Sequence, residues 1–248
     1  MFKKLACILS FFWVAAAAAS GQTTIHVAAA ANLQSVLTSK IIPAFEAQSA
    51  VTVIPVFGAT KVLEQQFENG APYDVFISAD TATVDKLAAE KLVDKNSVTT
   101  YAIGTLVLWS PNSASAHPKS VNDLTNPQYK HIAVANPKTA PYGTAAIESL
   151  TSANLLTTLN PKIVYAENIQ QALQYAVSGN ADVAFTALSL VISRNDGVWV
   201  AVPPALHKPI EQSLGVALNA SAPAKLFAAY LTSKAVDQIW TTSGYSLP

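Results

Sequence analysis

Residues 51–80 read VTVIPVFGATKVLEQQFENGAPYDVFISAD, and this stretch predicts a strand, a helix and a second strand in succession. Its first seven residues are mostly apolar or β-branched, and Gly58 marks a turn. Apolar residues then recur at helical spacing from Val62 to Phe67, and another apolar run follows at 74–78. Strands that alternate with helices are typical of an α/β fold.

The same alternation continues along the whole chain. It predicts one longer strand at 101–109 and a last helix at about 223–240, besides further strands at 24–29, 131–135, 162–166, 181–186, 198–202 and 213–218 and helices at 32–45, 81–92, 141–150 and 169–177. The pattern runs twice, on either side of a loop-rich segment at 110–120. We therefore expect two α/β lobes with mainly parallel sheets flanked by helices. A small ligand would then bind in the cleft between the lobes, which close by a hinge.

Charge and cysteine content exclude several classes of protein. The 248 residues contain 15 Lys and Arg against 15 Asp and Glu, so the net charge is zero, and no basic surplus points to a nucleic acid. Charged residues make up 12% and hydrophobic residues 51%, a composition that excludes a disordered chain. A single cysteine, Cys7, excludes both a disulfide scaffold and a cysteine-based metal cage.

The first residues predict an exported protein. Lys3 and Lys4 precede an apolar run from Leu5 to Ala19, which small residues follow. This pattern indicates a secretory signal peptide at 1–20 with cleavage near Ala19 to Gly21, and the run is short for the ~20 residues of a membrane span. Cys7 would leave with the signal peptide, and the mature protein would be periplasmic.

Sequence motifs of catalysis are missing. The chain contains no G-x-S-x-G, H-E-x-x-H, P-loop or G-x-G-x-x-G motif, and its histidines show no metal-ligand spacing. Asp74 and Asp80 flank a predicted strand, where we expect them to cap a helix and bond a sheet edge. We accordingly predict no enzyme, no catalytic residue, no directly bound metal cation and no cofactor.

Four turns that contain no Lys or Arg, each between a predicted strand and a helix, are the candidate site. They lie at 30–32, 58–60, 141–143 and 167–169, two in each half of the chain. A helix N-terminus offers free backbone N–H groups and a partial positive charge, and such turns gather at the carboxyl ends of parallel strands. They could enclose a small anion. Asn32 is also a candidate N-cap, and Lys61 is the one cation beside these turns.

At these turns the chain resembles the periplasmic molybdate-binding proteins of ABC transporters. The resemblance is carried by VAAAANL (27–33), FGATKVLEQQFENGAPYDVFISAD (57–80), IAVANPKTAPYGTAAIESL (132–150) and YAENIQQAL (165–173). It implies a type II periplasmic-binding fold whose two lobes are joined by hinge strands, with lobe 1 at 23–103 and 216–248 and lobe 2 at 104–215. The implied ligands are molybdate and tungstate, the implied partner is a membrane ABC permease, and the protein would act as a monomer.

The resemblance also implies the ligand contacts. They fall on Asn32, Thr60, Tyr142 and Ile169, through backbone N–H groups, the Asn32 amide and the Thr60 hydroxyl. Relatives often place a tyrosine on a later strand, where this chain has Phe185, which has no hydroxyl. The Tyr142 hydroxyl is a candidate replacement.

Other functions stay open on the sequence alone. One is a binding protein for another oxyanion such as sulfate or phosphate, or for an organic acid. A carboxylate ligand would favour an arginine in the cleft, but the only arginine, Arg194, lies outside the four turns. Others are a secreted α/β hydrolase, which would need a nucleophile and a base, and an adhesin or structural protein.

Overall fold

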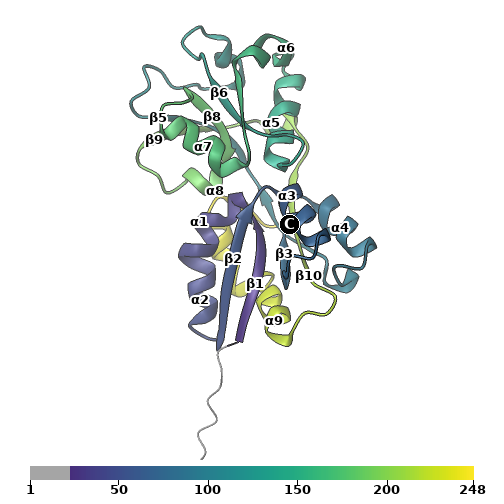
Figure 1. Ribbon diagram of the computed structural model, residues 1–248. Coiled ribbons are helices and arrows are strands. Elements are labelled where there is room, and N and C mark those ends of the chain that lie inside the picture. The colour runs from purple at the N-terminus through teal and green to yellow at the C-terminus, as the bar shows by residue number, and fades with distance from the viewer. Residues whose placement is uncertain (1–22) are drawn as a thin grey trace, which may run out of the picture.

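The computed structural model describes residues 23–248, which form two lobes, each built around one β-sheet (Figure 1). The predicted signal peptide at 1–20, with Cys7, lies outside the described residues. No helix within residues 23–248 combines the length and the apolar character that crossing a bilayer requires.

Lobe 1 is built on a six-stranded sheet in the order β11-β4-β10-β3-β1-β2. Its strands are β1 (Thr23–Ala30), β2 (Val51–Gly58), β3 (Val75–Ile77), β4 (Thr99–Gly104), β10 (Ile210–Val216) and β11 (Tyr245–Ser246). Its helices are η1 (Ala31–Leu33), α1 (Gln34–Val36), η2 (Leu37–Ile41), α2 (Ile42–Glu46), α3 (Thr60–Glu68), α4 (Thr81–Ala89), η3 (Lys95–Ser97), α9 (Ala222–Leu231), η7 (Lys234–Val236) and α10 (Asp237–Thr242).

Lobe 2 is built on a five-stranded sheet in the order β7-β6-β8-β5-β9. Its strands are β5 (Leu106–Pro111), β6 (Ile132–Ala135), β7 (Ile163–Ala166), β8 (Val183–Ala187) and β9 (Gly197–Ala201). Its helices are η4 (Val121–Thr125), α5 (Pro141–Ser152), α6 (Leu156–Leu159), η5 (Asn160–Lys162), α7 (Ile169–Val177), α8 (Leu188–Val191) and η6 (Pro204–Leu206). The two-lobed α/β prediction is confirmed.

Apolar side chains on both faces of the first sheet explain why helices cover both. Successive residues of a strand point to opposite faces. Ala28 of β1 and Phe76 of β3 pack with Leu63 and Phe67 of α3 on one face, and Val27 and Ile77 join the main core on the other. Burial on both faces accounts for the near-continuous apolar runs by which the sequence shows these strands.

Both sheets are mixed rather than mainly parallel. β1 runs parallel to β2 and β3, and β6 runs parallel to β7 and β8, as expected from strand–helix alternation. However, β10 is antiparallel to β3 and β4, and β5 is antiparallel to β8 and β9. Sequence alternation cannot reveal strands that enter a sheet from the other lobe.

The predicted strand at 101–109 is wrong as a single element. Thr105 interrupts it, so that β4 belongs to the first sheet and β5 to the second. The chain thus crosses between the lobes at this residue. The return crossing comes before β10, which starts at Ile210 in the first sheet, whereas the family pattern had assigned residues up to 215 to lobe 2.

The predicted last helix is also interrupted. α9 ends at Leu231, and Thr232–Ser233 and η7 separate it from α10. The break places Trp240 of α10 with its indole Nε1 donating to the Leu231 carbonyl at 3.0 Å. The apolar spacing across this segment therefore reflects two packed helical pieces, not one helix.

Candidate ligand-binding site

One small cavity between the lobes brings together all four predicted site residues. Asn32 and Thr60 come from lobe 1, and Tyr142 and Ile169 come from lobe 2. The space that it offers to a water-sized sphere is about 10 Å³, and its remaining lining residues are Ala30, Ala31, Gly58, Ala59, Ala79, Ala140, Pro141 and Asn168. A space of this size is about what one water molecule needs and lies far below the ~300–1,000 Å³ of typical organic-ligand pockets, so an organic ligand does not fit.

Each of these residues lies in the first turn of a helix that follows a strand. Thr60 and Ile169 open α3 and α7, Tyr142 is the second residue of α5, and Asn32 lies within η1. The preceding strands are β2, β7, β6 and β1, and their carboxyl ends face the cleft, where open α/β sheets bind ligands. Asn32 is not an N-cap, as the sequence had suggested, because Ala30 holds that position.

Backbone N–H groups at this cavity lack protein partners. Within residues 23–248, the N–H groups of Asn32, Thr60, Tyr142 and Ile169 donate to no protein acceptor. The Asn168 side chain caps α7 by accepting from the Gln171 N–H at 2.9 Å, and leaves the first N–H of the helix free. Such free groups at helix starts attract negative charge.

Among residues 23–248, no charged side chain lines the cavity. The Lys61 ammonium lies 2.9 Å from Glu64 Oε2, on the outside of α3. The Arg194 guanidinium pairs with Asp196 and lies 5.6 Å from the ring centre of Trp109. The site therefore offers dipoles and no counter-ion to an anion.

The two aspartates that flank β3 have the structural roles expected of them. Asp80 caps α4, since its Oδ1 accepts from the Thr83 N–H at 2.8 Å. Asp74 Oδ2 accepts from the His26 N–H at 2.8 Å at the sheet.

The Thr60 hydroxyl is positioned as a donor. Thr60 Oγ1 accepts from the Ala79 N–H at 3.3 Å, and the side chain is buried. Its own proton has no acceptor among the described residues. Because the Thr60 oxygen accepts from the Ala79 N–H, the hydroxyl proton points away from Ala79 and can be donated to a ligand.

The Asn32 amide is held differently from expectation. Its Nδ2 donates to Gln212 Oε1 at 2.8 Å and to the Tyr245 hydroxyl at 2.9 Å, which uses both of its protons. Its Oδ1 is buried and has no partner within residues 23–248. Gln212 and Tyr245 were missed by sequence reasoning, because they follow Asn32 by 180 and 213 residues and belong to no local motif.

The Tyr142 hydroxyl also contacts Gln212. It accepts from Gln212 Nε2 at 3.1 Å, and its ring is buried. Burial, reinforced by the nearby Tyr245, raises the pKa of Tyr142 well above its usual value, while the bond from Gln212 lowers it, so this phenol is neutral at physiological pH. Phe185 is buried within β8 and does not line the cavity.

Hydrogen bonds also join the lobes beside the cavity. Ser189 Oγ in α8 of lobe 2 donates to the Asn32 carbonyl of lobe 1 at 2.9 Å, and Gln212 Nε2 of lobe 1 donates to the Tyr142 hydroxyl of lobe 2 at 3.1 Å. The structure therefore shows a closed arrangement of the lobes.

A serine–histidine pair lies away from the cavity. Ser110 Oγ and His117 Nδ1 are 2.8 Å apart, so His117 is not simply solvated. Ser110 is fully buried, and His117 bonds no carboxylate within residues 23–248. A hydrolytic nucleophile needs substrate access and an oriented base, and this pair provides neither.

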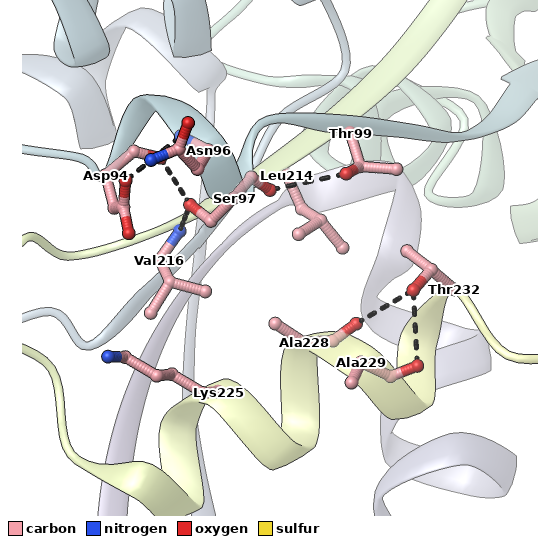
Figure 2. A pocket seen from close by; sticks show the side chains of 10 residues that line it. All are labelled: Asp94, Asn96, Ser97, Thr99, Leu214, Val216, Lys225, Ala228, Ala229 and Thr232. Carbon is pink, nitrogen blue, oxygen red and sulfur yellow. Dashed lines mark hydrogen bonds between the residues drawn. The ribbon is translucent and has the colours of Figure 1, made fainter.

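A larger surface pocket lies in lobe 1 between α9 and β10 (Figure 2). It has a volume of about 300 Å³ on the same measure and includes the charged side chains of Asp94 and Lys225. Its polar groups largely bond the protein itself, as where Ser97 Oγ accepts from the Val216 N–H at 2.9 Å. None of the four predicted site residues reaches it.

Two α/β lobes that enclose a small uncharged cavity define a two-lobed ligand-binding protein of the periplasmic-binding class. A family model described as bacterial extracellular solute-binding protein matches residues 25–246, and the chain belongs to this family.

Named relatives lie within the same class. The molybdate-binding protein ModA of Azotobacter vinelandii is 35% identical over 240 residues, which cover 93% of each chain. ModA of Rhodobacter capsulatus is 40% identical over 168 residues, which cover 68% of this chain and 66% of that protein. The solved periplasmic molybdate-binding protein of Azotobacter vinelandii matches with a TM-score of 0.83 at 32% identity, over 90% of this chain and 99% of that one.

A more distant structure shares only the fold. The sulfate-binding protein SubI of Mycobacterium tuberculosis H37Rv matches with a TM-score of 0.76 at 18% identity, over 90% of this chain and 86% of that chain.

Proposed function

We propose that this protein captures molybdate, and also tungstate, in the cavity between its lobes and delivers the anion to a membrane ABC permease. It acts in the periplasm as a monomer after cleavage of its signal peptide, without a cofactor and without catalysis. The single observation that carries the proposal is the set of four partnerless backbone N–H groups at one cavity that no charged side chain lines. The 35% identity to ModA of Azotobacter vinelandii supports this choice of oxyanion.

Neutral donors can hold a doubly charged anion if there are enough of them. Burial of a charge without partners is costly, and hydrogen bonds to charged groups contribute about 1.5–3 kcal/mol each. The N–H groups of Asn32, Thr60, Tyr142 and Ile169, with the Thr60 hydroxyl, supply donors from both lobes. Closure of the lobes therefore completes the donor set and favours the bound form.

A donor-lined cavity also selects among oxyanions. Hydrogen phosphate carries an O–H group, which would meet donors instead of an acceptor, so it is rejected. Sulfate has the same charge as molybdate but is smaller, and its oxygens would span the donors of the two lobes less completely. Size thus separates sulfate from molybdate, and protonation separates phosphate.

The test is a thermal-shift series on the mature protein with molybdate, tungstate, sulfate, phosphate and chromate. A ligand that binds only the folded state raises the melting temperature, by an amount that grows with the logarithm of its concentration over its dissociation constant. We expect large shifts with molybdate and tungstate and none with the other three. If sulfate or phosphate gave the largest shift, that anion would replace molybdate as the proposed ligand. Turnover of a generic ester would instead indicate a hydrolase.

A further inference from the structure

We propose that Gln212 is a positioning residue of this site, and that it turns together with Asn32 so that the Asn32 amide N–H group faces the bound anion. The inference rests on the proposed function, because it assigns a role within the same oxyanion site. Gln212 itself does not line the cavity. It acts through Asn32 and Tyr142, one from each lobe.

Gln212 bonds both lobes from a fully buried position on β10. Its Oε1 accepts from Asn32 Nδ2 at 2.8 Å and from the Tyr101 hydroxyl at 3.1 Å, and its Nε2 donates to the Tyr142 hydroxyl at 3.1 Å. Gly104 of β4 makes room for this contact. A Cβ atom there would lie 2.1 Å from the Tyr142 hydroxyl oxygen and 2.6 Å from Gln212 Nε2.

The observed orientation of the Asn32 amide does not suit a bound anion. Asn32 Nδ2 spends both protons on Gln212 and Tyr245, and its partnerless Oδ1 lies on the other side of the amide. A buried acceptor beside an anion is repelled by it and lacks a hydrogen bond as well. The anion therefore favours any arrangement that exchanges this oxygen for a donor.

A paired turn of two amides achieves this exchange without moving the backbone. The oxygen and nitrogen of an amide have nearly the same size, so each group can turn end for end in place. With both turned, Gln212 Nε2 donates to Asn32 Oδ1, and Asn32 Nδ2 takes the place of the partnerless oxygen. The Tyr142 hydroxyl then donates to Gln212 Oε1.

The surrounding hydroxyls accept either arrangement. The Tyr101 hydroxyl lies 3.2 Å from the Ser78 carbonyl, to which it donates when Gln212 no longer offers it an oxygen. The Tyr245 hydroxyl can donate to Asn32 Oδ1, because Ser189 Oγ still donates to the Asn32 carbonyl. Every buried group of the cluster is then paired, and Gln212 links the orientation of Asn32 to that of Tyr142.

The first test uses the unmodified mature protein. Side-chain amide resonances of Asn32 and Gln212 are followed by NMR while molybdate is added. We expect both pairs of resonances to shift together with saturation. Molybdate binding that leaves the Asn32 amide resonances in place would overturn the paired turn and leave the proposed function intact, whereas absence of any oxyanion binding would overturn both.

The second test is a double-mutant cycle measured by calorimetry with molybdate. We expect Gln212→Met and Asn32→Ala each to weaken binding about tenfold, the effect of one lost hydrogen bond to an anion. Combined, they should weaken it no more than the worse single change, because both remove the same oriented donor. If the double variant lost affinity by the product of the two single losses, a positioning role for Gln212 would be contradicted. Wild-type molybdate affinity in Gln212→Met would contradict it as well.

Ser213→Ala serves as the matched control. Ser213 is buried on the same strand and bonds the Thr100 hydroxyl at 3.1 Å, outside the Asn32 cluster. Its loss should change the melting temperature of the ligand-free protein without changing molybdate affinity. A similar loss of affinity in this variant would reduce Gln212 to a general structural role of β10.

Discussion

The Lys61 N–H group in the first turn of α3 donates a hydrogen bond of 3.0 Å to the Thr139 carbonyl, and so joins lobe 1 to the turn before α5 in lobe 2. The second free N–H of α3 thus binds the opposite lobe, while the first, on Thr60, is left for the cavity. The N-terminus of α3 therefore contributes both to closure of the lobes and to the ligand-binding cavity. Closure needs no charged contact, since Lys61 contributes its backbone and not its ammonium.

Thr60→Val is expected to weaken molybdate binding by roughly 1–3 kcal/mol, because one anion oxygen loses its hydroxyl donor while the side chain keeps its shape. The Ala79 N–H group also loses its acceptor, so a small drop in melting temperature should accompany the change. Calorimetry measures the affinity. Thr60→Ser retains the hydroxyl and should bind within about threefold of the wild type. Equal molybdate affinity of the valine and serine variants would mean that the Thr60 hydroxyl does not contact the ligand.

Much of the lobe organisation could be predicted from local sequence, because the central parallel strands, such as β1 and β6, are buried and carry apolar runs. The four turns at Asn32, Thr60, Tyr142 and Ile169 could also be found, since each follows a predicted strand. The split at Thr105 could not, because the run from 101 to 109 is apolar apart from Gly104 and Thr105, and only tertiary packing assigns its halves to different sheets. An apolar sequence pattern shows that residues are buried, but it does not show which lobe's core they join.

The orientation of the site's side chains was beyond prediction for a related reason. The sequence indicated that the Asn32 amide would face the ligand, but its partners come from β10 and β11, at the far end of the chain. Hydrogen bonds between residues 180 or more positions apart leave no periodic trace. The residue types in a turn can therefore be read from the sequence, whereas the distant residues that orient their side chains cannot.

Gly104→Ala is expected to destabilise the protein and weaken molybdate binding together. The added Cβ would overlap the Tyr142 hydroxyl and the Gln212 amide, and overpacking of this kind costs about 1–3 kcal/mol. Urea unfolding and calorimetry measure the two effects. Gly70→Ala is the control, because its φ of 89° makes alanine strained while open space surrounds the added atom. Gly70→Ala should lower the free energy of unfolding without changing molybdate affinity. Unchanged molybdate affinity in Gly104→Ala would mean that packing at β4 does not influence the site.

Three buried tyrosines predict a loss of stability at alkaline pH. Burial raises the pKa values of Tyr101, Tyr142 and Tyr245 above the value of about 10 expected in the unfolded chain. Below pH ~10 both states hold these protons, so they add no pH dependence there. Above it the unfolded chain releases them first, and the free energy of unfolding falls by about 1.4 kcal/mol per pH unit for each tyrosine.

Urea unfolding at a series of pH values measures this slope. Tyr142→Phe removes one of the three groups and should make the alkaline decline shallower, whatever its effect at neutral pH. A variant that declines as steeply as the wild type would mean that Tyr142 ionises in the folded protein. That result would contradict the neutral, buried phenol beside Gln212.

Molybdate affinity is expected to depend little on ionic strength. Ion pairs between exposed groups weaken as salt shortens the screening length, from about 30 Å at 0.01 M to about 8 Å at 0.15 M. In the part of the chain that the structure describes, no charged side chain lines this cavity, and the residues that carry its donors are buried, so salt screens these dipoles little. Calorimetry over that range should show a change below about threefold, with only the general screening of the protein's own charge. Lys61→Ala should give the same values, because its ammonium pairs with Glu64 outside the cavity. A steep fall in affinity that Lys61→Ala abolishes would show that this cation, and not the backbone dipoles, holds the anion.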